Sequence, residues 1–189
     1  MIFQEGDNGN GIYIVETGKI KVFKLSVDGK EQILHIYGPG HTFGEVPVFQ
    51  GKSFPASAMT LEPSGIIFLP RDRFVALITT TPALGMNMLA DLSRRLRAFT
   101  VQIEALSLKE VPARLAAYFL TLSKEQKNKT KVRLPISKAQ LSNLIGTTPE
   151  TVSRMLKKMG DAGLIRVQTR TIEILDADGL NDLSESGRL

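Results

Sequence analysis

The stretch from Leu144 to Ile165, which reads LIGTTPETVSRMLKKMGDAGLI, decides the fold of the C-terminal part of the chain. It predicts one helix before Gly146 and a second helix from Pro149, because glycine tolerates a tight turn and proline suits the first position of a helix. Thr148 is the expected N-cap of the second helix, and Ser137 is the expected N-cap of the first. Two helices joined by such a turn are typical of a helix-turn-helix.

The second of these helices has one apolar side and one polar side. The apolar residues recur at helical spacing and should face the core: Val152, Met155, Leu156 and Met159. The candidate DNA-binding residues at its start and along its outer side are Thr148, Glu150, Ser153, Arg154, Lys157 and Lys158. Arginine reads guanine in the major groove, a carboxylate accepts from cytosine, and lysines hold phosphates. We therefore interpret this segment as a DNA recognition helix.

Two short strands follow the recognition helix, at residues 163–167 and 171–175. Gln168-Thr169-Arg170 lies between them, which predicts a wing whose Arg170 touches the DNA backbone. From residue 109 onward the chain carries fourteen Lys and Arg against nine Asp and Glu, whereas the earlier part is balanced. A basic C-terminal part fits a polyanionic partner. The alternative, a structural three-helix bundle without a ligand, leaves the basic wing unexplained.

The N-terminal part is rich in strands. Period-two or apolar runs separated by turn residues are expected at residues 12–15, 19–25, 32–37, 56–61 and 66–69. Short strands at this spacing indicate a compact β-barrel or roll. Helices are expected at residues 71–78 and from Pro82, and a further helix at 111–122 precedes a lysine-rich polar run.

A long apolar seam marks the helix that begins at Pro82. Its apolar positions recur at alternating spacings of three and four residues: Leu89, Leu92, Leu96, Phe99, Ile103 and Leu106. The alternative is a helix packed on its own domain, but the stripe is narrow and outlasts the small roll. We therefore expect a homodimer. The predicted fold is α+β, with an effector-sensing β-roll at residues 1–81, a dimerisation helix at 82–108 and a winged helix-turn-helix at 109–189.

The composition excludes several classes of protein. Without cysteine, the chain can form neither disulfides nor a cysteine-ligated iron–sulfur cluster. The start has no basic leader followed by an apolar core, and the uncharged run at 74–90 is too short and polar to span a bilayer. We expect a cytoplasmic protein with no membrane partner. No catalytic triad, phosphate loop or dinucleotide motif is evident, and two histidines make a poor metal set for a cupin-like enzyme, so we predict that the chain is not an enzyme.

These segments resemble the CRP/FNR family of bacterial transcription regulators. The family's recognition helix carries E-x-x-S/G-R, and Glu150, Ser153 and Arg154 occupy those positions. Residues 2–24 (IFQEGDNGNGIYIVETGKIKVFK) and 38–49 (GPGHTFGEVPVF) are similar to its effector roll. Residues 103–123 (IEALSLKEVPARLAAYFLTLS) resemble the nitric-oxide-responsive, dissimilatory nitrate respiration regulators. The resemblance implies duplex DNA with inverted TTGAT-like or TTGAC-like half-sites, and RNA polymerase as a further partner.

The resemblance also implies an effector pocket at Gly44, Glu45, Phe54 and Ser57. Cyclic AMP binders of the family have a Gly-Glu pair and then an Arg-Ser pair that holds phosphate and ribose. Here the second pair is Ala56-Ser57, and no arginine occurs from residue 52 to 65. Because a cyclic phosphate would lose its main charge-assisted contacts, we expect a different effector. A cyclic-nucleotide-responsive regulator of the same fold is the alternative.

Haem is one candidate effector, and a small organic molecule is the other. The only histidines are His35 and His41, and either is a candidate haem ligand in a nitric-oxide sensor. The alternative interpretation makes His35 an ordinary strand residue and His41 a polar loop residue.

Overall fold

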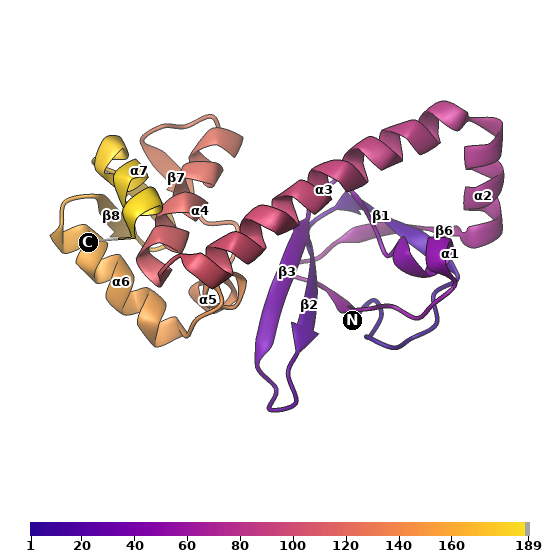
Figure 1. The fold of residues 1–189 in the computed structure, drawn as a ribbon, viewed down its shortest axis with the longest axis horizontal. Coiled ribbons are helices and arrows are strands. Elements are labelled where there is room, and N and C mark those ends of the chain that lie inside the picture. Colours follow the sequence, from indigo (N-terminus) through magenta and orange to yellow (C-terminus); the bar gives the residue numbers. More distant parts are fainter. Residues whose placement is uncertain (188–189) are drawn as a thin grey trace. The chain divides into compact units, whose positions relative to one another are not determined.

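The computed structural model describes residues 1–187. It consists of two units, one from Met1 to Leu96 and one that begins at Arg97. The boundary falls inside the long helix α3 (Pro82–Leu108), within the segment that the sequence predicts to dimerise. Strands and helices follow the predicted order, and the α+β class is confirmed: strands, then a long helix, then a winged helix-turn-helix (Figure 1).

The first unit contains two antiparallel three-stranded sheets. One has the order β4-β1-β6 and the other the order β3-β2-β5. The strands are β1 (Gly11–Thr17), β2 (Ile20–Leu25), β3 (Glu31–Tyr37), β4 (Thr42–Phe43), β5 (Ser57–Thr60) and β6 (Gly65–Pro70). Inward residues of these strands form one aromatic-rich core together with Phe3 and Phe54 from the segments between and before them: Val15, Ile20, Tyr37, Phe43 and Ala58. This core fixes both ends of the segment between β4 and β5, which carries Glu45.

Two short helices cover the first unit beside the start of α3. The helix α1 (Val46–Gln50) has proline in its first turn, where the missing N–H costs no hydrogen bond. The helix α2 (Arg71–Thr80) buries Phe74 against Ile12 and Val48, which forms a second small core.

The helix α3 has 27 residues, and none of them is buried. In residues 1–187 no single helix is both long and apolar enough to cross a membrane. The helices α2 and α3 meet that test of length and composition only as a pair, which is bent by 110°.

The second unit packs four helices on a small sheet. The helices are α4 (Val111–Glu125), α5 (Lys138–Ile145), α6 (Pro149–Asp161) and α7 (Ala177–Ser186). The sheet has the order β7-β9-β8, with strands β7 (Lys131–Arg133), β8 (Ile165–Gln168) and β9 (Thr171–Ile174). The largest fully buried side chains of the second unit are Leu115, Phe119, Leu141, Met159, Ile165, Ile172 and Leu180. Leu180 belongs to α7, a helix that packs against α4.

Candidate DNA-binding surface and effector pocket

The turn between α5 and α6 has the geometry that its sequence predicts. Ser137 and Gln140 form a reciprocal capping box at the start of α5. Gly146 ends that helix at φ +73°, a left-handed conformation that favours glycine, and its N–H donates to the Ser142 carbonyl. The Thr148 hydroxyl accepts from the backbone N–H of Thr151 at 3.3 Å. These local hydrogen bonds set the direction in which α6 leaves the turn.

The helix α6 buries one side and exposes the other. Val152, Leu156 and Met159 are buried in the core of the second unit, and Met155 is half-buried. The predicted outward residues are all exposed: Glu150, Ser153, Arg154, Lys157 and Lys158. Within residues 1–187 none of the charged members of this set forms an ion pair. The side is therefore a polar surface whose charges are available to a ligand.

Two of the predicted DNA-binding residues also have structural roles at the start of α6. The Arg154 guanidinium donates to the Thr151 hydroxyl at 3.2 Å, which holds it near the N-terminal end of the helix. Thr148 is exposed, but its hydroxyl caps α6 and donates to the Thr151 hydroxyl at 3.1 Å.

The wing is the hairpin of β8 and β9. Its turn is Thr169-Arg170, between the paired residues Gln168 and Thr171. Thr169 has φ +52°, and Arg170 is exposed at the tip. The Arg170 carbonyl accepts from the backbone N–H of Leu134 at 2.7 Å, so the tip is anchored to the end of β7.

The first unit contains a cavity of about 260 Å³. It is lined by Gly40, His41, Thr42, Glu45, Asn87, Met88, Asp91, Leu92 and Arg94. The lining therefore comes from the segment around β4 and from the first part of α3. It combines two carboxylates, one guanidinium and the apolar Met88 and Leu92.

The structure places only Glu45 of the four predicted pocket residues in the lining of this cavity. Gly44 is adjacent at φ +75°, and a Cβ there would lie 3.0 Å from the Tyr13 ring, so the position requires glycine. Phe54 is buried and stacks on Phe3 with 3.7 Å between ring centroids. Ser57 is buried and accepts from the Glu5 N–H at 3.0 Å. Phe54 therefore belongs to the core, and Ser57, the first residue of β5, supports the turn at Glu5.

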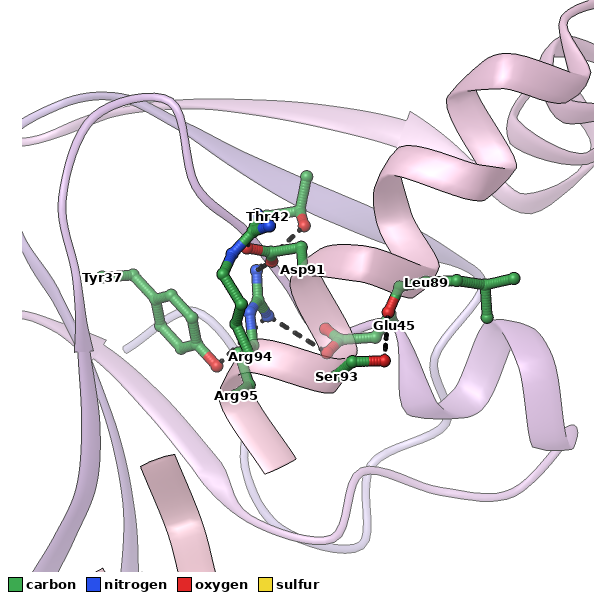
Figure 2. Close-up of polar contacts among 8 residues, drawn as sticks. All are labelled: Tyr37, Thr42, Glu45, Leu89, Asp91, Ser93, Arg94 and Arg95. Carbon is green, nitrogen blue, oxygen red and sulfur yellow. Dashed lines mark hydrogen bonds and ion pairs between the residues drawn. The ribbon is translucent and has the colours of Figure 1, made fainter. Parts of the chain in front are cut away.

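Arg95 is a residue of this site that the sequence interpretation did not single out. Its side chain is only 10% exposed and bridges Glu45 at 3.2 Å and Asp91 at 2.6 Å. It also donates to the Thr42 hydroxyl at 3.3 Å and the Tyr37 hydroxyl at 3.4 Å (Figure 2). The guanidinium carbon lies 4.9 Å from the centre of the Tyr37 ring, a cation–π distance. Arg95 thus connects α3 to the sheets and to the segment before α1.

The charges of this cluster balance one another. Burial alone would raise the pKa of Asp91, but the Arg95 and Arg94 guanidiniums outweigh it and lower that pKa. Burial raises the pKa of Tyr37, which keeps its hydroxyl protonated. The sequence pattern that could have identified this cluster is the spacing of Asp91, Arg94 and Arg95, since residues three and four apart lie on one helix face.

The two histidines occupy different environments. His35 lies on β3 beside the Tyr37 ring, 4.5 Å between centroids, and burial followed by the Arg95 charge lowers its pKa to about 4. His41 is exposed, with Nδ1 3.1 Å from the Gly38 carbonyl oxygen. Residues 1–187 contain no group of three His, Asp or Glu side chains that could hold a metal ion.

The cavity that His41 lines does not fit haem. Its volume is below the roughly 300–1,000 Å³ of typical organic-ligand sites, and a tetrapyrrole needs far more room than the smallest of these. Three charged side chains also line it, whereas a porphyrin plane needs apolar walls.

The predicted dimerisation residues form an exposed apolar stripe on α3. Leu89, Leu96 and Ile103 are 58%, 69% and 64% exposed, and Phe99 is 36% exposed. Leu92 and Leu106 are half-buried.

Comparisons with known proteins agree with this arrangement. The chain matches the family model of the cyclic nucleotide-binding domain over residues 1–81 and that of the Crp-like helix-turn-helix domain over residues 113–183. It is 33% identical over 183 residues to the cyclic AMP receptor protein of Thermus thermophilus, which covers 97% of this chain and 83% of the relative. It is 31% identical to the anaerobic regulatory protein of Haemophilus influenzae, over 100% of this chain and 74% of that protein.

A solved structure shows the same fold. A CooA mutant from Carboxydothermus hydrogenoformans superposes with a TM-score of 0.85 at 24% identity, over 97% of this chain and 83% of that one. The chain therefore belongs to the CRP/FNR family: it is a DNA-binding transcription regulator with a cyclic-nucleotide-binding-type domain before its helix-turn-helix, in a family whose members are dimeric.

Proposed function

We propose that this regulator reads an inverted repeat through α6 and that a small-molecule effector in the first unit controls its affinity for DNA. The observation that carries the proposal is the outer side of α6, where exposed polar residues that form no ion pair within residues 1–187 lie opposite the apolar stripe of Val152, Leu156 and Met159. Because any surface helix has a polar outer side, the proposal also rests on the place of α6 as the second helix of the matched helix-turn-helix domain.

Each residue on this surface has a distinct role in the proposal. Arg154 donates to guanine O6 and N7, Glu150 accepts from a cytosine amino group, and Ser153 contacts a neighbouring thymine. Lys157, Lys158 and Arg170 hold phosphates, which positions the protein without reading sequence. The half-sites are TTGAT-like or TTGAC-like, as the resemblance of the recognition helix to the CRP/FNR family implies, and RNA polymerase is the proposed further partner.

Replacing a base-reading residue and replacing a phosphate-binding residue should impair DNA binding in different ways. We expect Arg154→Ala to cost roughly 1–3 kcal/mol per half-site and to erase the preference for one G·C pair. Lys158→Ala should weaken binding to all sequences alike and lower the salt slope by about one unit. Competition binding on duplexes substituted one base pair at a time, at two salt concentrations, measures both effects. Full discrimination at every base pair by Arg154→Ala would mean that the recognition helix is misassigned.

The charges in the cavity favour an effector other than a cyclic nucleotide. Arg95 is already neutralised by Glu45 and Asp91, and Arg94 is paired with Asp91 at 3.1 Å. A cyclic phosphate would therefore meet no uncompensated positive charge, and the nearby carboxylates would repel it. A small molecule that donates hydrogen bonds to Glu45 and lays an apolar part on Met88 and Leu92 fits this lining better.

A cyclic-nucleotide effector is the second candidate, and one observation favours it. Although residues 52–65 lack arginine, Arg94 reaches the cavity from α3, and its side chain is 71% exposed and able to turn. The relative from Thermus thermophilus is named as a cyclic AMP receptor.

A further inference from the structure

The connection between α3 and α4 consists of two residues, Lys109 and Glu110. Glu110 is the N-cap of α4, with an extended backbone, and its side chain makes no capping hydrogen bond. The Lys109 N–H donates to the Ala105 carbonyl at 3.1 Å, which is the hydrogen-bond pattern of the helix before it. The backbone of Lys109 is therefore held by the end of α3.

The side chain of Lys109 extends to the C-terminal end of α7. Its Nζ donates to the Ser184 carbonyl at 2.9 Å. Ser184 lies in the last turn of α7, where carbonyls lack partners within the helix and the helix dipole favours a cation. In the part of the chain that the structure describes, Lys109 forms no ion pair. One residue thus connects the end of α3 to α7, through its backbone on one side and its ammonium group on the other.

The helix α7 is held in place by other contacts. It buries Leu180 and Leu183 and packs against α4 (Figure 1). The Asp176 carboxylate caps its first turn by accepting from the Gly179 N–H at 2.9 Å. Fixing a long lysine side chain in one conformation costs conformational entropy, which a lysine that extended into solvent would not lose. Because α7 is already anchored, the main effect of the Lys109 bond is on the end of α3.

The end of α3 carries part of the apolar stripe that is expected to pair two copies of the chain. Phe99, Ile103 and Leu106 belong to the same unit as α7, because this unit begins at Arg97. In this unit α7 packs on α4, and α4 contacts both α5 and α6. A bond that fixes the end of α3 to α7 therefore also fixes the helix-turn-helix relative to the stripe.

We propose that Lys109 is a positioning residue for DNA binding, whose bond to the Ser184 carbonyl sets the spacing between half-sites that the dimer accepts. A helix-turn-helix dimer binds half-sites whose separation matches the distance between its two recognition helices. One added base pair moves a half-site by about 3.4 Å and rotates it by about 35° around the duplex. A firmly held helix-turn-helix cannot follow that change, whereas a loosely held one can. This inference rests on the proposed reading of an inverted repeat.

The test measures binding of the full-length protein to inverted repeats with the preferred spacing and with one or two base pairs more or fewer. We expect the wild type to lose affinity by about tenfold or more at the altered spacings, because both half-sites can no longer be bound at once. Lys109→Met keeps an unbranched side chain but removes the charge, and should reduce this penalty to about threefold or less. Lys109→Arg keeps a cationic donor and should retain the wild-type preference, as should Lys129→Met, which removes an exposed charge from the same unit.

A duplex with a single half-site separates positioning from direct contact and from folding. All four proteins should bind it equally, because only one helix-turn-helix is engaged. A spacing preference in Lys109→Met equal to that of the wild type would overturn the proposal. So would an equal loss of affinity on every duplex, the single half-site included, as expected if Lys109 held a phosphate or mainly supported the fold. A wild type that bound the repeat no more tightly than the single half-site would contradict the proposed function, and the assignment of Lys109 with it.

Discussion

Arg95 is the residue on which the polar structure of the first unit depends. Its guanidinium touches Glu45, Asp91, Thr42 and Tyr37, so its charge is shared among groups from α3, the sheet and the loop before α1 (Figure 2). The same charge acts on His35. Burial is the larger cause of the low pKa of His35, and the Arg95 charge is the next.

The low pKa of His35 makes the stability of the first unit depend on pH. The folded state holds His35 neutral down to about pH 4, whereas the unfolded chain takes up the proton near pH 6.5. Between these values the unfolded state binds more protons, so stability is full above pH 6.5 and is lost as the pH falls towards 4. We expect a loss of about 2 kcal/mol between pH 7.5 and pH 5 from this residue.

Hydrogen exchange of the β2 and β3 amides measures this effect in the first unit alone. His35→Gln should flatten the pH dependence of protection between pH 5 and 7.5. His41→Gln changes the exposed histidine and should leave that dependence as in the wild type. A wild-type pH profile that His35→Gln does not alter would contradict the assignment.

At the scale of elements, α6 and α3 both carry an apolar stripe at helical spacing, but only the stripe of α6 is buried. The helix α6 buries its apolar stripe within its own unit, which leaves exposed the polar side that is proposed to read DNA. No residue of α3 is fully buried, and Leu89, Leu96 and Ile103 remain more than half exposed. An exposed apolar stripe of this length is stabilised when a second copy covers it.

We expect the stripe of α3 to be the dimer interface. Leu96→Glu with Phe99→Glu places two like charges opposite their copies in a parallel two-fold dimer, so association should be lost. The monomers should remain folded, because neither residue is part of either core. Light scattering gives the mass and circular dichroism the helix content. A dimer mass that does not change would refute the assignment, and Arg97→Glu on the same helix serves as the control for added charge.

At the scale of the whole molecule, the cavity proposed for the effector belongs to the first unit and the helix-turn-helix to the second. Effector control therefore requires a coupling free energy between two distinct sites. Such coupling is reciprocal and typically amounts to roughly 5–150-fold in affinity.

A substitution in the cavity should therefore change the affinity for DNA, although the replaced side chain is not expected to contact DNA. Glu45→Gln releases one partner of Arg95, and we expect it to shift the effector-free affinity for the inverted repeat by about fivefold or more. Glu62→Gln, in an exposed pair with Lys19, is the matched control. Unchanged affinity in Glu45→Gln would contradict the coupling. On the same duplex, added cyclic AMP should have no effect, and saturable binding that raises DNA affinity would establish the cyclic-nucleotide alternative.

The DNA-binding half could be predicted because its signals are local in sequence. The Ser137 capping box, the left-handed Gly146 and the Thr148 cap depend on residues at most a few positions apart, and so does the spacing of Val152, Leu156 and Met159. The short helix α1 and the final helix α7 were not expected. The helix α1 is only five residues long, and α7 is stabilised by packing on α4, which no local pattern reports.

The lining of the cavity proposed for the effector was decided by the tertiary structure. The sequence identified Glu45 but grouped it with Phe54, which packs in the core, and Ser57, which begins β5; neither lines this cavity. Arg94 and Arg95 reach the same site from about fifty residues farther along the chain, because α3 packs on the segment around β4. Periodicity reports which side of a helix is polar, but which partner that side meets depends on long-range packing. The sequence by itself therefore determined the family and the helix-turn-helix, and only the folded chain showed which charges line the cavity proposed for the effector.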